Sequence, residues 1–90
     1  MDKEYMLFRV RERIKELERR YKIYVQGLNL KGAELIPGTA ALKRCETKRS
    51  IQILTLIEYL LLTSNSVFIE DEDALEGFEK LVNPRETVNK

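Results

Sequence analysis

The first third of the chain places apolar side chains at alternating spacings of three and four residues. They are Leu7, Val10, Ile14, Leu17, Tyr21, Tyr24 and Leu28. Residues 2–26 contain neither proline nor glycine and are rich in Glu, Lys, Arg and Leu, which are good helix formers. This pattern predicts one helix of about seven turns with a coiled-coil-like apolar seam.

A second, more apolar segment follows a connection rich in turn residues. Gly27 is placed to close the first helix in a left-handed conformation, and the leucines and isoleucine of residues 28–36 predict that the connection packs onto the helices. Thr39 is the expected N-cap of a second long helix, over about residues 39–63. From residue 51 to 62 only three side chains are polar, Gln52, Thr55 and Glu58. One neighbouring helix cannot cover so much apolar surface.

A third, short helix is expected near the end of the chain. Asp73, with Glu76 three residues later, has the spacing of a capping box for a helix that begins at Ala74. Gly77 suggests a close approach to a neighbouring element, and Asn83-Pro84 stops the helix. Residues 67–69 form a short apolar run that could be extended. We therefore expect one helical domain over residues 1–84 and a polar tail over residues 85–90.

The predicted fold is all-α, with two long antiparallel helices and a short C-terminal helix packed across them. The seam of residues 7–28 has two interpretations, which are packing against the second long helix of the same chain and pairing with another copy. A homodimer of two helical hairpins satisfies both the seam and the apolar half of the second helix. The oligomer interface predicted on this basis comprises Leu7, Val10, Ile14, Leu17, Tyr21, Tyr24, Ile53, Ile57, Leu60 and Leu61.

Charge is divided along the chain although the net charge is only +1. Residues 1–50 hold thirteen Lys/Arg and seven Asp/Glu, giving +6, whereas residues 51–90 hold three and eight, giving −5. The division indicates either two halves that attract each other within the fold or a dimer, or a basic surface for an anionic partner. The best candidates for nucleic-acid contacts are the basic residues in the first half of the second helix, Lys43, Arg44, Lys48 and Arg49.

The residue types argue against catalysis and against a metal or cofactor site. The chain has no histidine, the usual general base near neutral pH and a common metal ligand, and Cys45 is its single cysteine. The acidic run of residues 70–73 lacks the spacing of a calcium-binding loop and suits the capping of a helix. We predict no catalytic residue, no metal and no cofactor. We also predict no membrane-spanning segment or secretory signal, and hence a cytoplasmic location.

Two functional hypotheses follow from these patterns. The first is a non-enzymatic helical adaptor or regulatory protein that acts through protein–protein interaction and self-association, with a homodimer as its expected state. The second is a small nucleic-acid-binding regulator of transcription or replication that uses Lys43, Arg44, Lys48 and Arg49. An enzyme is the least favoured class, because it would have to rely on Tyr, Lys and carboxylates alone.

Overall fold

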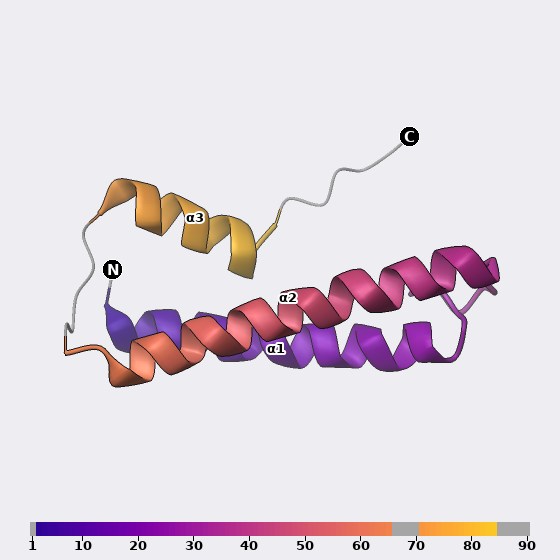
Figure 1. Ribbon diagram of the computed structural model, residues 1–90, viewed down its shortest axis with the longest axis horizontal. Helices are drawn as coiled ribbons and strands as arrows, with labels where there is room; N and C mark the ends of the chain where they lie inside the picture. The colour runs from indigo at the N-terminus through magenta and orange to yellow at the C-terminus, as the bar shows by residue number, and fades with distance from the viewer. Residues whose placement is uncertain (1, 66–70, 85–90) are drawn as a thin grey trace.

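The computed structural model describes residues 2–65 and 71–84, and within them the chain is helical (Figure 1). The three helices are α1 (Lys3–Val25), α2 (Pro37–Thr63) and α3 (Glu72–Val82). The prediction of an all-α fold with two long helices and a short third one is confirmed. The apolar run predicted at residues 67–69 and the polar tail of residues 85–90 lie outside the described residues.

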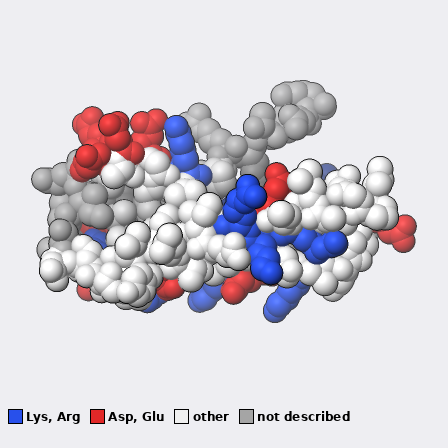
Figure 2. Space-filling view, in the orientation of Figure 1, with Lys and Arg blue, Asp and Glu red and all other residues white. Residues whose placement is uncertain are grey.

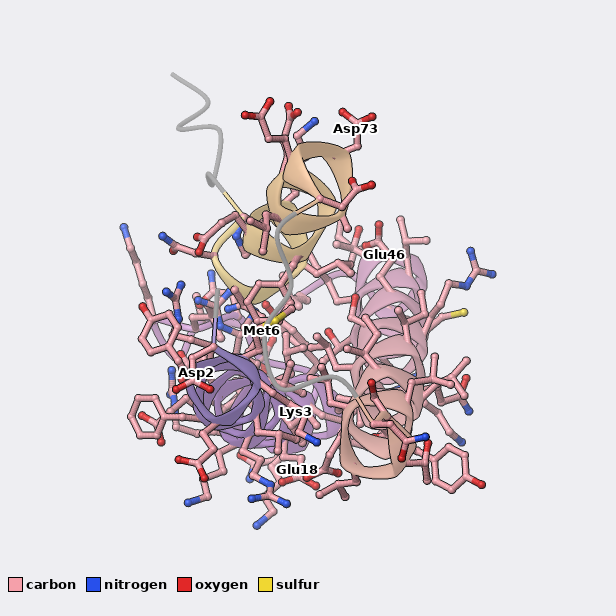
Figure 3. All side chains as sticks on the ribbon, turned by 90° about the vertical axis from the view of Figure 1, so that its left-hand side faces the viewer. Asp2, Lys3, Met6, Glu18, Glu46 and Asp73 are labelled. Atoms are coloured by element: carbon pink, nitrogen blue, oxygen red, sulfur yellow. The ribbon has the colours of Figure 1, made fainter. Side chains whose placement is uncertain are left out.

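The two long helices form an antiparallel hairpin, and α3 covers one end of it. Figure 1 shows α1 and α2 side by side over most of their length, with α3 above the end where α1 begins and α2 ends. Seen along the hairpin, the three helices form a triangle, and Met6 of α1 lies in the space between them (Figure 3). This arrangement explains why Met6 is buried although it stands in the second turn of α1.

The core repeats every seven residues along both long helices. Val10, Leu17 and Tyr24 are buried on α1, and α2 buries Ala40, Thr47, Leu54 and Leu61. This heptad spacing is that of two helices packed with coiled-coil geometry. Small side chains fill the loop end of α2 and leucines fill the end beneath α3. At that end Phe78 and Val82 of α3 join the cluster.

A compact turn joins α1 to α2. Gly27 has a φ of 79°, its amide donates to Tyr24 O at 2.9 Å, and the amide of Leu28 donates to Ile23 O at 3.3 Å. These two bonds are those of a Schellman motif, so the prediction for Gly27 is confirmed. The prediction that the connection packs down is wrong for Leu30 and Ile36, since both side chains are exposed. They lie on the outside of a turn that is held mainly by its own backbone hydrogen bonds.

Two predicted helix starts are wrong, that of α2 by three residues and that of α3 by two. Helix α2 begins at Pro37 rather than after Thr39, because proline at the first helical position needs no N–H partner and has the right φ. Helix α3 is capped by Asp71 rather than Asp73, and the Asp71 carboxylate accepts a hydrogen bond from the amide of Ala74 at 2.9 Å. Glu72 and Asp73 then lie in its first turn, where the helix dipole favours negative charge.

Ion pairs connect the basic half of the chain to the acidic half. Arg11 of α1 contacts Glu58 of α2 at 2.7 Å, and Arg9 of α1 contacts Glu79 of α3 at 3.6 Å. The predicted attraction between the two halves is therefore present inside the fold. Both pairs are partly exposed, so each contributes at most about 1 kcal/mol to folding.

Candidate interaction surface

The outer side of α2 carries a band of exposed apolar side chains. Ile53, Leu56 and Leu60 are 42%, 58% and 55% exposed, and Tyr59 and Leu62 beside them are 62% and 54% exposed. We call Ile53, Leu56 and Leu60 the outer stripe, because their spacing of three and four residues places them along one side of the helix. Figure 2 shows this part of α2 as a white surface below the acidic α3.

An apolar pocket of about 440 Å³ adjoins the outer stripe between α2 and α3. Leu60 belongs to both features. The floor reaches Met6 of α1, and the residues that line the pocket are Met6, Ile57, Leu60, Leu61, Ser64, Ala74, Gly77, Phe78 and Leu81. An apolar pocket beside an exposed apolar stripe is a candidate binding surface.

Gly77 lines this pocket instead of marking a tight contact. A methyl group added at its Cα would meet nothing within 4 Å, so the predicted close approach of another element at Gly77 is wrong. Because residue 77 has no side chain, the surface of α3 is open above the pocket. The glycine therefore contributes to the size of the pocket and not to the packing of α3.

The structure divides the ten residues predicted for the oligomer interface into two groups. Val10, Leu17, Tyr24 and Leu61 are at most 7% exposed and are covered by their own chain. Leu7, Ile14 and Ile57 pack against the same core, and Tyr21 is half-buried. The seam of α1 is thus used within the hairpin. Of the ten, Ile53 and Leu60 are exposed and available to a second molecule.

The four basic residues predicted to contact nucleic acid do not form one face of α2. The exposed ones, Lys43, Lys48 and Arg49, are separated from one another by at least about 100° around the helix axis. Arg44 is half-buried, and its guanidinium donates to Tyr24 O at 3.4 Å, at the C-terminal end of α1.

Protein-family models, curated proteins and solved structures all give no match to this chain.

Side chains that could bind a metal ion are not brought together in the described part of the chain. Over residues 2–65 and 71–84 no three Cys, Asp or Glu side chains are close enough to hold a metal ion. Cys45 is exposed on α2. None of the described helices is both long and apolar enough to cross a bilayer.

The pKa of one carboxylate is strongly displaced, and the cause is local to α1. Glu16 accepts two hydrogen bonds from the guanidinium of Arg19, at 2.7 and 3.0 Å, and one from Arg20 at 3.4 Å. The bonds from Arg19 are the main reason that the pKa of Glu16 falls to about 2. Since Glu16 lies away from the pocket and from the outer stripe, this shift concerns stability and not a site.

Sequence reasoning missed Leu56 and Tyr59, two of the most exposed members of the surface. The signal exists in the sequence, because Leu42, Glu46, Arg49, Ile53, Leu56 and Leu60 follow one another at spacings of three and four. Two charged residues interrupt this second seam. The uninterrupted seam of α1 is therefore the stronger signal in the sequence.

Proposed function

We propose that this chain is a non-enzymatic helical adaptor or regulatory protein that self-associates through the outer surface of α2. The outer stripe and the adjoining pocket are its binding surface, and α1 and α3 hold that surface in place. The observation that carries this proposal is the exposure of Leu56, Tyr59, Leu60 and Leu62 on one half of a helix whose opposite side is already packed. Contiguous apolar surface of this kind is stabilised when a second protein surface covers it.

The experiment that tests this proposal compares the mass in solution of the natural sequence and of two variants. Sedimentation equilibrium should give a concentration-dependent dimer for the natural sequence and a monomer for Leu56→Asp, because a carboxylate buried in an apolar interface is strongly unfavourable. Phe8→Asp is the matched control, since Phe8 is 58% exposed and lies on the side of α1 opposite the buried Val10. Equal dimerisation of all three proteins would contradict the proposal.

The exposed Lys43, Lys48 and Arg49 support nucleic-acid binding as a second, weaker candidate function. Their spread around α2 limits how many phosphates one duplex could present to them. The test is fluorescence anisotropy of labelled DNA and RNA between about 50 and 200 mM salt, where several phosphate contacts change affinity by orders of magnitude. Binding that falls steeply with salt and is lost in Lys48→Glu/Arg49→Glu would favour this function over self-association.

A further inference from the structure

The seam of α2 that contains the outer stripe continues toward the start of the helix. Its charged residues limit which partner surface can pair with it. Counting back from Leu60 and Leu56, the same side of the helix carries Ile53, Arg49, Glu46 and Leu42. Leu42, like the outer stripe, is exposed, at 59%. Glu46 and Arg49 are also exposed, and in the described residues neither forms an ion pair with its own chain. The seam thus has two apolar ends and one acid and one base between them.

We infer that the partner is a second copy of this chain, bound antiparallel along α2, with the two-fold axis between Thr47 and Lys48. This inference rests on the proposed function and adds the identity and register of the partner. In this register Glu46 of each copy lies opposite Arg49 of the other. Two ion pairs therefore form between the copies, one on each side of the two-fold axis. Leu42 then lies opposite Ile53, apolar against apolar.

Other antiparallel registers of the same seam leave its two charges unpaired. A shift by one heptad sets Glu46 opposite Leu56 and Arg49 opposite Ile53, which leaves both charges in apolar surroundings. A shift by two heptads pairs Ile53 with Leu56 but sets Arg49 opposite Leu60. A parallel pair sets Glu46 against Glu46 and Arg49 against Arg49, and like charges in contact repel. Charge complementarity therefore favours the register centred between Thr47 and Lys48.

The same register supplies an occupant for the pocket between α2 and α3. Ile36, which precedes α2, is 75% exposed and is the most exposed large apolar side chain in the described residues. In the inferred register Leu35 of the second copy lies opposite Leu60, which lines the pocket on the side of α2 where α3 packs, and Ile36 is the residue that follows Leu35. Figure 3 places Glu46 on this same side of α2. The symmetry of the dimer fills both pockets in the same way.

The gross charges of the two copies agree with this arrangement. An antiparallel pair places the basic first half of each α2 beside the second half of the other copy's α2. The acidic α3 lies at that end of the other copy. Glu72, Asp73 and Glu76 are exposed on α3, and Figure 2 shows an acidic group at the end of the molecule where α3 lies. Opposite charges at the two ends steer the copies into an antiparallel encounter.

A charge exchange in the seam tests the inferred register. Glu46→Arg and Arg49→Glu should each raise the dimer dissociation constant at least about tenfold, because each places two like-charged pairs across the axis. The double variant Glu46→Arg/Arg49→Glu should return it to within about threefold of the natural value, because the ion pairs form again with reversed sign. Lys48→Glu is the control, since Lys48 lies outside the seam. Two single variants that dimerise like the natural protein would overturn the register.

Distances between spin labels on the two copies test the direction of pairing. Cys45 is the single cysteine, and in the inferred register the two copies of it lie five residues apart along the axis, about 8 Å, so their labels should be within about 20 Å. In a Cys45→Ser background, labels at Leu62→Cys should be about 45 Å apart. A parallel dimer would give a short distance at both positions, and that result would overturn the inference.

The pocket contact is tested by Ile36→Asp. This variant should raise the dissociation constant at least about tenfold, whereas Phe8→Asp should leave it unchanged. If Leu56→Asp abolishes the dimer while the charge exchange and Ile36→Asp have no effect, the binding surface is right and the register is wrong. If the natural protein is monomeric at every concentration, both the inference and the proposed self-association fail.

Discussion

The Lys3 side chain, at the first residue of α1, donates from Nζ to the carbonyl oxygen of Ser64, the C-cap of α2, at 3.0 Å. At the other end of the hairpin, Arg44 of α2 donates to Tyr24 O in the last turn of α1 at 3.4 Å. Each long helix thus supplies a cation to the negative end of the other. These contacts, together with Arg11 and Glu58, define one antiparallel register.

Replacing Lys3 should weaken the hairpin at its open end. We expect Lys3→Met to lower the free energy of unfolding by about 0.5–1 kcal/mol, because Ser64 O loses a charged donor. Urea denaturation followed by circular dichroism measures this, in a Leu56→Asp background so that self-association does not contribute. Lys15→Met, at an exposed position of the same helix, is the control. A loss of the same size in both variants would show that the contact with Ser64 is not its cause.

The packing of α2 against α1 should depend most strongly on Leu54. This side chain is 1% exposed and belongs to the cluster that also contains Val10 and Phe78. Leu54→Ala should cost about 2–5 kcal/mol through lost burial and the cavity left behind. Phe8→Ala removes a larger side chain from an exposed position and should cost less than about 0.5 kcal/mol. Similar losses in the two variants would mean that the described core is not the stabilising one.

The local features of this fold could be predicted because each depends on a few neighbouring residues. Gly27 ends α1 as expected, since only glycine adopts its left-handed conformation at little cost. The apolar spacing of α1 identified its buried side correctly. The spacing could not show which helix covers that side. Val10, Leu17 and Tyr24 would form the same pattern against α2 or against a second chain.

The helix starts and the outer surface show where sequence reasoning fails for physical reasons. Both Asp71 and Asp73 can cap a helix, and the choice depends on how many backbone bonds the earlier start adds, such as that from Leu75 N to Asp71 O at 3.0 Å. The exposure of Leu56 depends on which sides of α2 are covered by α1 and α3, which is a tertiary property. The apolar half of α2 identified Ile53 and Leu60 as candidate interface residues but not Leu56.

Substitution of Gly77 should stabilise α3. Glycine is a poor helix former, and no atom lies within 4 Å of a methyl group placed there. We therefore expect Gly77→Ala to raise the free energy of unfolding by about 0.5–1 kcal/mol in thermal or urea denaturation. Gly27→Ala is the opposite control, because a φ of 79° strains alanine and should lower stability by about 1 kcal/mol. A destabilised Gly77→Ala protein would contradict the described packing of α3.

The lowered pKa of Glu16 predicts a specific loss of stability in acid. Its folded value of about 2 lies below the ordinary value of 4.5, so the folded state holds the charged form more strongly than the unfolded state does. The stabilisation is complete above pH 4.5 and is lost as the pH falls through the window from 4.5 to about 2. Because this carboxylate is partly exposed to water, the amount is only a few tenths of a kcal/mol.

Glu16→Gln should remove this contribution and flatten the stability profile between pH 4.5 and 2. Arg19→Gln removes the donor that lowers the pKa and should flatten the same window. The double variant should be no flatter than Glu16→Gln alone, because the contact with Arg19 is already lost when Glu16 is replaced. Urea denaturation at several pH values measures the three profiles. Additive effects of the two substitutions would mean that Glu16 and Arg19 stabilise α1 independently, and the pKa of Glu16 would then need another cause.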